Sequence, residues 1–339
     1  MTRGDDDARS DGPHRSGVVV LGSLNMDLSV SVPEIPRPGE TVLGGPVTRR
    51  PGGKGANQAV AVARLGGDVH LIGRLGGDGF ADSIRTVLED AGVGMAHVRT
   101  MDSVESGMAF VTVDGHGENA IVVSSGANAE LTPAEVESDA GVLKRSRIAV
   151  AQLETPLDAV SRFAELCEQY GVDLVLNAAP FRPLPPDLLR RCTYLVLNRD
   201  EASALTDITV RQRADAYRAL AEVAGQGPST VVITLGGEGC VALTGDTVVE
   251  LDAYEVPVVD TTGAGDAFVG ALAVALSTDS GFDDALMFAA AAGAATCAHT
   301  GAQSPTTSQQ ARRLLEEQPQ VPRRTPASEL LITTPATER

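Results

Sequence analysis

The chain contains no tryptophan, and only 3% of its 339 residues are aromatic. Surfaces that stack nucleic-acid bases usually present aromatic rings, so this composition argues against such a role. Positive charge is also scarce, since 27 Lys and Arg stand against 45 Asp and Glu, for a formal net charge of −18. A field of this sign repels phosphate backbones and anionic lipids, so we expect neither nucleic acid nor a membrane as a partner.

Cysteine and long apolar runs are also lacking. The four cysteines are widely spaced and include no CxxC pair: Cys167, Cys192, Cys240 and Cys297. This spacing argues against a disulfide framework or a structural zinc site and fits reduced thiols in the cytoplasm. The first residues are acidic, without the apolar segment of a signal peptide. The longest apolar stretches, 267–276 and 285–298, are too short or too rich in alanine to span a bilayer. We therefore expect a cytoplasmic protein.

Several familiar catalytic motifs are missing as well. Lys54 is followed by Gly55 instead of Ser or Thr, so there is no P-loop. Gly22-Ser-Leu-Asn25 stands where a Rossmann dinucleotide site would have GxGxxG. No GxSxG or HExxH occurs, and the five histidines have no metal-ligand spacing. Any chemistry must come from other patterns.

What the sequence does contain is a regular alternation of short apolar runs and helical patterns. The expected strands are Val18–Leu21, Val69–Ile72, Ile148–Ala151, Leu174–Leu176, Tyr194–Leu197 and Val231–Thr234. The expected helices are Ala56–Leu65, Phe80–Ala91, Leu157–Tyr170, Arg211–Ala224, Ala264–Leu276 and Asp283–Ala298. Such alternation predicts an α/β fold, a Rossmann-like three-layer sandwich with a mainly parallel central sheet covered on both faces.

Residues 28–51 and 107–125 break the alternation. The second stretch has two runs of strand pattern, Met108–Val113 and Asn119–Val123, around an Asp-Gly turn. We interpret both stretches as antiparallel hairpins that form a small β-sheet lid on one α/β domain of residues 17–308. We expect residues 1–16 to be a disordered tail, and 309–339 to form a helix and a partly disordered tail.

The strongest local signal is Asp260-Thr-Thr-Gly-Ala-Gly-Asp266, which precedes an apolar helix. Small residues at a helix start leave N–H groups free at the positive end of the helix dipole, which suits a phosphoryl group in transfer. Asp266, in the first turn, can accept the proton of an attacking hydroxyl. By itself, the pattern also fits a glycine-rich loop with an Asp that caps its own helix.

Two further segments carry polar side chains at expected ligand positions. The glycine-rich stretch 51–58 opens a helix and places Asn57 about one turn inside it, where its amide can meet sugar hydroxyls. Asn25 and Asp27 follow the first strand and share one face by the period of two. Either segment alone also fits an ordinary turn or cap.

Taken together, the three segments resemble the ribokinase family of sugar kinases over about residues 17–303. Other segments that match the family are Pro38-Gly-Glu-Thr41, Gly126-Ala-Asn128, Gln152-Leu-Glu-Thr155, Asn198-x-x-Glu201, Thr234-Leu-Gly-Gly-Glu-Gly239 and Gly301-Ala-Gln303. The resemblance implies the ribokinase-like fold, ATP-dependent phosphorylation of D-ribose at O5, the cofactors Mg²⁺ and K⁺, and a homodimer formed through the β lid.

The same resemblance implies roles for individual residues. Ribose would contact Asn25, Asp27, Gly53, Lys54, Asn57, Glu154 and Asp266. Asp266 would be the general base, beside an anion hole of Gly263, Ala264 and Gly265. ATP would lie against Asn198, Thr234, Gly236, Gly237, Gly239 and Gly265, with Glu201 acting indirectly on Mg²⁺. K⁺ would be held by Asp260, Thr262, Thr296, His299, Gly301 and Ser304.

The chain departs from the family pattern at Ala81, at Ala290 near the expected adenine, and at the inverted pair Ser304-Pro305. Two other functions remain open. One is a kinase of the same family that acts on another pentose, a ketose or a nucleoside. The other, a non-catalytic sugar sensor, is disfavoured because Asp266 and Glu201 are both retained.

Overall fold

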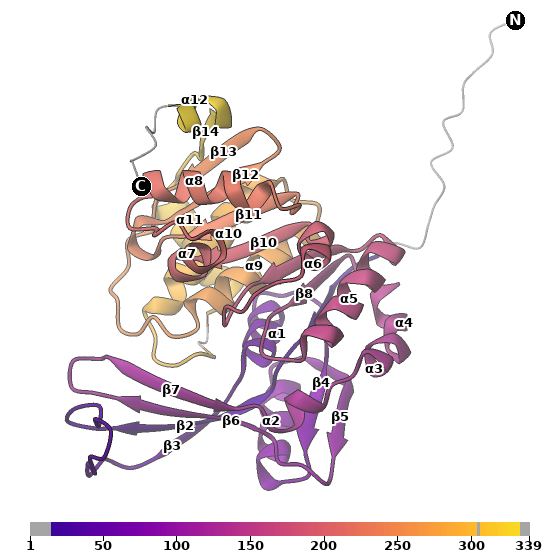
Figure 1. The fold of residues 1–339 in the computed structure, drawn as a ribbon, viewed down its shortest axis with the longest axis vertical. Coiled ribbons are helices and arrows are strands. Elements are labelled where there is room, and N and C mark those ends of the chain that lie inside the picture. The colour runs from indigo at the N-terminus through magenta and orange to yellow at the C-terminus, as the bar shows by residue number, and fades with distance from the viewer. Residues whose placement is uncertain (1–14, 304–305, 333–339) are drawn as a thin grey trace, which may run out of the picture.

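The computed structural model describes residues 15–303 and 306–332, and the described residues form two β-sheets (Figure 1). The expectations for residues 1–14 and 333–339, and for Ser304 and Pro305, lie outside the described residues.

The larger sheet has ten strands within the described residues. In spatial order they are β14 (Arg323–Pro326), β13 (Thr247–Leu251), β12 (Cys240–Thr244), β11 (Thr230–Thr234), β10 (Tyr194–Asn198), β9 (Asp173–Asn177), β8 (Ile148–Ala151), β1 (Val18–Leu21), β4 (Val69–Gly76) and β5 (Gly94–Met101). Neighbours from β5 to β11 are parallel, and the pairs from β11 to β14 are antiparallel. The central strands β1 and β8 are fully buried, as their unbroken apolar sequences require.

Helices cover both faces of this sheet, and each face has its own apolar cluster. One face carries α1 (Lys54–Arg64), α2 (Gly79–Asp90), α9 (Ala264–Ser277), α10 (Phe282–Cys297) and α11 (Ser308–Glu317). The other carries α3 (Pro133–Ser138), α4 (Ala140–Leu143), α5 (Leu157–Tyr170), α6 (Pro186–Arg191), α7 (Arg199–Thr206), α8 (Arg213–Ala224) and α12 (Ala327–Ile332). The expected three-layer sandwich is therefore confirmed. No helix in the described ranges is long and apolar enough to cross a membrane.

The smaller sheet is the lid, with strands in the order β3 (Thr48–Gly52), β2 (Asn25–Ser31), β6 (Gly107–Val113) and β7 (Asn119–Ser124). It projects from the body as a separate layer (Figure 1). The β2–β3 and β6–β7 pairs are antiparallel, as the sequence predicted, but β2 and β6 join in parallel. This junction was not foreseen, because hairpin signals are local and it joins residues far apart in the chain.

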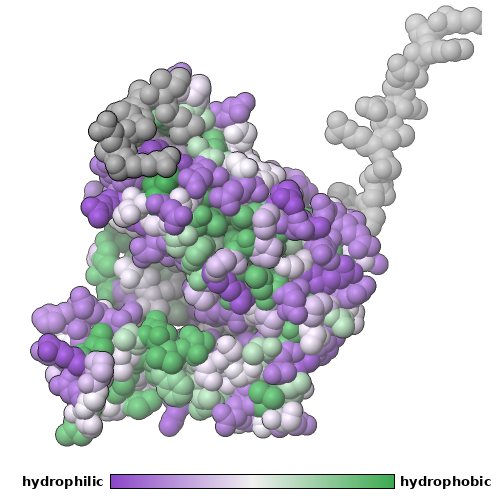
Figure 2. Space-filling view, viewed as in Figure 1, coloured by the Kyte–Doolittle hydropathy of each residue, from purple (hydrophilic) through white to green (hydrophobic). Residues whose placement is uncertain are grey.

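The two faces of the lid differ in character. Directly opposite residues share a face, so Asp27, Ala109 and Val123 lie on one side. Leu28, Phe110 and Val122 lie on the other side, where Phe110 and Val122 are exposed. Apolar side chains gather over the lid in the space-filling view (Figure 2).

The C-terminal region is more structured than the sequence suggested. The expected helix is α11, and beyond it β14 adds a strand beside β13 and α12 packs against the body. The segment 323–326 has no apolar alternation, since its sequence is Arg-Arg-Thr-Pro. Its strand conformation therefore depends on the partner strand, and pattern alone does not reveal it.

Candidate active site

The candidate residues gather at one edge of the main sheet. Parallel strands present their carboxyl ends together, and this edge is where open α/β sheets bind ligands. Asn25 and Glu154 follow β1 and β8 at this edge, and the strands β9, β10 and β11 end there with Asn177, Asn198 and Thr234. The first turns of α1 and α9 meet the same edge through Asn57 and Asp266. Residues that belong to separate sequence motifs therefore lie together at this edge of the sheet.

The start of α1 has no side-chain cap of its own. Instead, Glu154 Oε2 accepts hydrogen bonds from Lys54 N (3.0 Å) and from Ser23 Oγ (2.5 Å). Ser23 Oγ in turn accepts from Gly55 N (3.3 Å). Gly53 has φ +89°, and a Cβ there would lie 2.9 Å from Asn25 N. A residue after β8 and one after β1 therefore satisfy the free N–H groups of this helix, and Glu154 is a structural cap as well as a candidate sugar ligand.

The start of α9 is built around Gly263, at φ +80°. A Cβ on Gly263 would lie 2.2 Å from the carbonyl oxygen of Ala302, so only glycine fits. Asp266 follows in the first turn and is 8% exposed. Its Oδ2 accepts from Asn57 Nδ2 (3.0 Å), and its Oδ1 accepts from Gln58 Nε2 (2.9 Å). Two amides from α1 therefore fix the orientation of this carboxylate.

Behind Asp266 runs a chain of buried amides. Gln58 Nε2 also donates to Asn177 Oδ1 (3.0 Å), and Gln58 Oε1 accepts from Gln152 Nε2 (2.6 Å). Gln58 and Gln152 are fully buried. The chain links α1, α9 and the ends of β8 and β9, so Asp266 is held by a network and not by one contact.

The charged groups of the site influence one another. Burial, together with the negative charges of Glu154 and Asp266, raises the pKa of Asp27 to about 7. Burial alone would lower the pKa of Lys54, but Asp266, Glu154 and Glu201 outweigh it and raise the pKa. Burial raises the pKa of Glu201. The site thus has a surplus of carboxylate around one lysine, which leaves Lys54 charged at neutral pH.

A cavity of about 130 Å³ joins the expected sugar and nucleotide groups. It is lined by Lys54, Asn177, Ala179, Val196, Leu197, Asn198, Glu201, Thr234, Gly263, Gly265, Asp266, Phe268 and Val269. A second cavity of about 260 Å³ is lined by Glu154, by Val123 of the lid and by Arg182. Asp266 and Lys54 therefore lie at the nucleotide-side cavity, whereas Glu154 lines the second one.

Hydrogen bonds to neighbouring residues hold other expected site residues in place. Asn25 is buried, and its Oδ1 accepts from Asn128 Nδ2 (2.8 Å). Asn198 and Glu201 form the capping box of α7, in which Asn198 Oδ1 accepts from Glu201 N (2.8 Å) and Glu201 Oε2 accepts from Asn198 N (2.8 Å). Gly236 and Gly237 lie on a short 3₁₀ turn after β11, outside both cavities.

The Asp260 carboxylate holds the backbone of the expected cation site together. Asp260 Oδ1 accepts from Thr262 N (2.9 Å), and Asp260 Oδ2 accepts from Gly301 N (2.8 Å). Val259 N donates to Cys297 O (2.8 Å), which brings the loop against the end of α10 near Thr296 and His299. Burial opposes the charge on Asp260, but these hydrogen bonds and the charge of Arg50 outweigh it and lower its pKa. In the described ranges, no three His, Cys, Asp or Glu side chains converge on a metal position.

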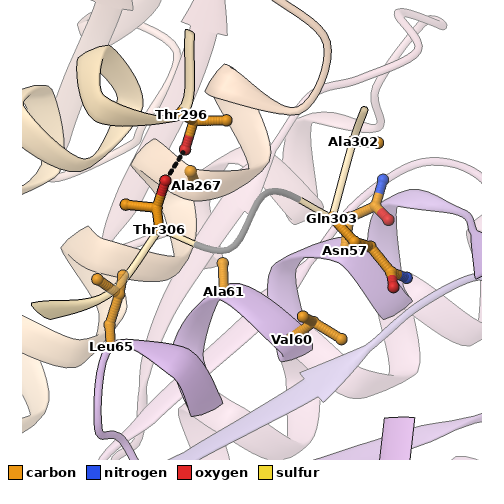
Figure 3. A pocket seen from close by; sticks show the side chains of 9 residues that line it. All are labelled: Asn57, Val60, Ala61, Leu65, Ala267, Thr296, Ala302, Gln303 and Thr306. Carbon is orange, nitrogen blue, oxygen red and sulfur yellow. Dashed lines mark hydrogen bonds between the residues drawn. The ribbon is translucent and has the colours of Figure 1, made fainter. Parts of the chain in front are cut away.

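A small cavity of about 10 Å³ lies among Asn57, Ala267 of α9, and the residues Ala302, Gln303 and Thr306 (Figure 3). On one side, Thr296 Oγ1 and Thr306 Oγ1 lie 3.0 Å apart and share a hydrogen bond. Among the described residues, neither Asn57 Oδ1 nor Gln303 Nε2 has a hydrogen-bond partner. The cavity has room for roughly one water molecule, so it is a packing gap behind Asn57 and does not extend the substrate cleft.

Sequence reasoning missed Ser23, Gln58 and Asn177 as parts of the site. Gln58 did carry a signal, because it is a polar residue directly before the apolar run Ala-Val-Ala-Val-Ala of the same helix. Ser23 and Asn177 had none, since a single polar residue at the end of a strand or just after it is common.

The chain is similar to known proteins over most of its length. Residues 15–309 match the family model described as pfkB family carbohydrate kinase. A ribokinase of Haemophilus influenzae is 38% identical over 86% of this chain and 95% of its own length, and one of Bacillus subtilis is 36% identical over 84% and 94%. A solved structure of Arabidopsis thaliana ribokinase with ribose and ATP has a TM-score of 0.83 at 30% identity, over 89% of this chain and 99% of that one. A match of this extent, over a site with this geometry, establishes that the chain belongs to the pfkB family of carbohydrate kinases.

Proposed function

We propose that this chain transfers the γ-phosphoryl group of ATP to O5 of D-ribose. The observation that carries the proposal is Asp266, a buried carboxylate in the first turn of α9 that is held by the amides of Asn57 and Gln58. Full-length similarity to ribokinases, one of them solved with ribose and ATP, supports the choice of both substrates.

The sugar is proposed to lie between the lid and the body. Asn25, Asp27 and the backbone of Gly53 face this space from β2 and the start of α1, and Glu154 closes it from β8. Carboxylates and amides can each take one or two hydroxyl groups, which suits a polyhydroxylated ring. Asp266 would then accept the O5 proton as O5 attacks phosphorus in line.

ATP is proposed to lie along the 130 Å³ cavity, with its base toward Thr234, Gly236, Gly237 and Gly239. The N–H groups of Gly263, Ala264 and Gly265 would meet the charge that develops on the phosphoryl oxygens. Lys54, which lines the same cavity, adds a fixed positive charge. Mg²⁺ would supply further neutralisation of the phosphates, with Glu201 and Asn198 close to it. The four unpaired cysteines agree with a cytoplasmic location, where ATP is available.

The test is a coupled assay of ADP release with Mg²⁺–ATP and a panel of D-ribose, 2-deoxy-D-ribose, D-fructose and nucleosides. We expect D-ribose to give the highest kcat/KM, and ³¹P NMR to place the new phosphate on O5. If a nucleoside or fructose exceeds ribose by about tenfold or more, about 1.4 kcal/mol, the substrate assignment is wrong.

A nucleoside is the second candidate because of the 260 Å³ cavity beside Glu154. Its walls include Val123, Leu153 and Pro156 as well as Arg182, so it offers apolar surface and one cation next to the sugar space. The nucleosides in the panel decide whether this space accepts a base.

The same assay tests the proposed K⁺ site. A cation at Asp260 and the carbonyls of Thr262, Thr296, His299 and Gly301 would steady the loop that leads into the anion hole. The loop already depends on Asp260 for two backbone hydrogen bonds, so a cation would act on turnover more than on ribose affinity. We expect a higher rate in KCl than in choline chloride at equal ionic strength. Equal rates would contradict the proposed cation site.

We also propose that two chains associate through their lids. The lid face that carries Leu28, Phe110 and Val122 exposes Phe110 (46%) and Val122 (67%). Strand β7 is exposed along its whole length. An exposed sheet with an apolar face is a natural site for a two-fold contact. Sedimentation at micromolar concentration should give the mass of a dimer, and Val122→Glu should shift it toward the monomer. Val321→Glu, at a position 88% exposed outside the lid, should leave the dimer intact, and a wild-type monomer would contradict the proposal.

A further inference from the structure

The C-terminal strap, residues 318–326, lies beyond the family domain. The family match ends at residue 309, and the ribokinases of Haemophilus influenzae and Bacillus subtilis cover 86% and 84% of this chain although they match over 95% and 94% of their own length. The strap nevertheless forms β14, which pairs with β13 in the register Glu250 with Arg323 and Val248 with Thr325. It is followed by α12, whose Ala327 and Leu330 pack on the apolar cluster beneath α8.

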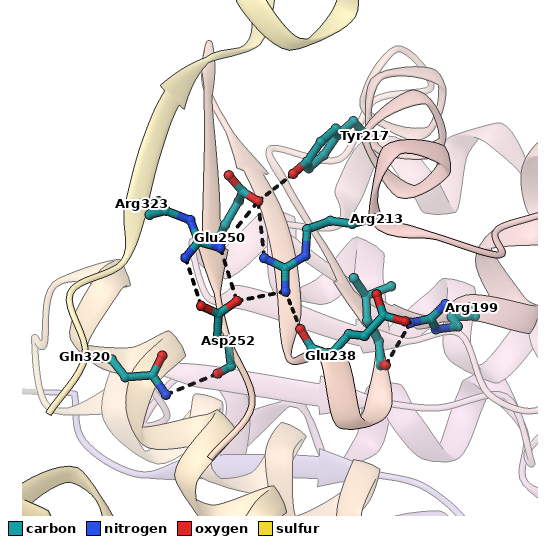
Figure 4. Close-up of polar contacts among 9 residues, drawn as sticks. Arg199, Arg213, Tyr217, Glu238, Glu250, Asp252, Gln320 and Arg323 are labelled. Carbon is teal, nitrogen blue, oxygen red and sulfur yellow. Dashed lines mark hydrogen bonds and ion pairs between the residues drawn. The ribbon is translucent and has the colours of Figure 1, made fainter. Parts of the chain in front are cut away.

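Arg323 of the strap takes part in an ionic network around Asp252 and Glu250 (Figure 4). Arg323 donates to both oxygens of Asp252, at 2.8 and 3.1 Å. Arg213 also donates to Asp252 Oδ1 (3.0 Å) and to Glu250 Oε1 (3.3 Å). Tyr217 OH donates to the same oxygen of Glu250 at 2.5 Å. Glu250 is 9% exposed, so two cations and a hydroxyl group surround a carboxylate that is largely removed from water.

The strap also holds the backbone after β13. Gln318 makes a two-way contact with Glu255, in which Nε2 donates to Glu255 O (2.8 Å) and Oε1 accepts from Glu255 N (2.9 Å). Gln320 Nε2 donates to Asp252 O (3.3 Å). Residues 252–255 are thus held at both ends, and they lead along the chain to Asp260 and the anion hole.

The same network reaches the loop between β11 and β12. Arg213 donates to the carbonyl oxygen of Glu238, and Arg199 donates to Glu238 Oε1 (2.6 Å) and to Leu235 O (3.0 Å). Gly239, in this loop, lies directly on the segment that the strap holds, since a Cβ there would be 2.1 Å from Leu251 O and 2.6 Å from Asp252 C. Thr234, at the start of the loop, lines the 130 Å³ cavity.

We propose that the strap is a positioning element for the nucleotide site: through Gln318 and Arg323 it fixes residues 251–255 and, across Gly239, the loop 235–239. This inference rests on the proposed binding of ATP along that loop. The physical reason is that Leu235 anchors only the start of the loop in the core, and no apolar side chain is buried from Gly236 to Gly239, so the position of this part depends on polar contacts from its neighbours.

The strap offers a matched pair of variants in the full-length chain. Gln318→Ala with Arg323→Ala removes the contacts to Glu255 and Asp252. Arg313→Ala with Arg324→Ala removes two other exposed ion pairs of the same region, to Glu317 and to Asp283, and leaves the loops untouched. Both variants lose one arginine of β14 and one side chain on or next to α11, although Arg323 pairs with Glu250 as well as Asp252, whereas Arg324 pairs with Asp283. The comparison of the two variants therefore separates a local effect on the loops from a general loss of stability.

We expect the first variant to raise KM for ATP by about three- to tenfold with KM for ribose unchanged, because exposed ion pairs and single hydrogen bonds contribute modestly. Hydrogen exchange should become faster at 235–239 and 251–256 in this variant and stay unchanged in the control. Equal effects in both variants, or unchanged hydrogen exchange in the first, would overturn the proposal that the strap positions these loops. If the wild-type chain does not use ATP, the proposed function fails, while the exchange measurement still decides whether the strap holds these loops.

Discussion

Asp266→Asn is expected to lower kcat by about 10²–10⁴-fold, the usual contribution of a general base. The substitution keeps the shape of the side chain and removes its capacity to take a proton. It also turns one oxygen into an NH₂ group, which must then face the amide of Asn57 or Gln58 where an acceptor stood. The loss should therefore be at the upper part of that range, because the side chain also loses its fixed orientation.

Ribose binding, measured by calorimetry, should change little in this variant, since Asn25, Asp27 and Glu154 remain. The control is Asp284→Asn, which makes the same chemical change in the first turn of α10, at an exposed position. The control should keep wild-type turnover. An Asp266→Asn enzyme that retains a tenth or more of the normal kcat would exclude this residue as the base.

Asp27→Asn is expected to weaken ribose binding by about 10²-fold. A hydrogen bond to a charged group contributes about 1.5–3 kcal/mol, and a carboxylate can hold two sugar hydroxyls at once. The Asp27 carboxylate packs directly against Gly52, because a Cβ on Gly52 would lie 2.1 Å from Asp27 Oδ2. The amide keeps the shape and one acceptor, so the expected loss is that of one charged contact, about 3 kcal/mol or 10²-fold.

The same substitution should stabilise the sugar-free protein at neutral pH. The pKa of Asp27 is raised from 3.8 to about 7 in the folded chain, so between these values the folded state holds a proton that the unfolded state releases. The free energy of unfolding therefore falls as the pH rises through this window, and it does not recover above pH 7. Asn cannot ionise, so the difference in Tm between variant and wild type should be small near pH 4–5 and positive at pH 8.

The measurement is a pair of thermal unfolding series from pH 5 to pH 8 without ribose. Glu118→Gln, at an exposed turn of the lid, removes one negative charge from the same sheet and should show no such trend. A variant that binds ribose normally, or one whose Tm advantage disappears at pH 8, would contradict the role assigned to Asp27.

The sequence alone determined the layered architecture and the loops that carry the chemistry. Apolar runs such as Ile148–Ala151 and amphipathic stretches such as Leu157–Tyr170 matched the structure residue for residue, because burial on a sheet or helix leaves a local pattern. The two glycine-rich loops were also readable, since positive φ at Gly53 and Gly263 demands glycine at those points.

Only the tertiary structure decided which polar groups meet. Ser23 and Glu154 cap α1 from 32 and 100 residues away in the chain, and Gln58 reaches Asp266 across 208 residues. The pairing of β2 with β6 and the placement of β14 beside β13 are likewise contacts between distant segments. Hydrogen bonds of this kind leave no periodic trace, because one polar residue in a loop looks the same whether or not a partner reaches it. The sequence could therefore nominate Asp266, but only the folded chain supplies the amides that hold it in place.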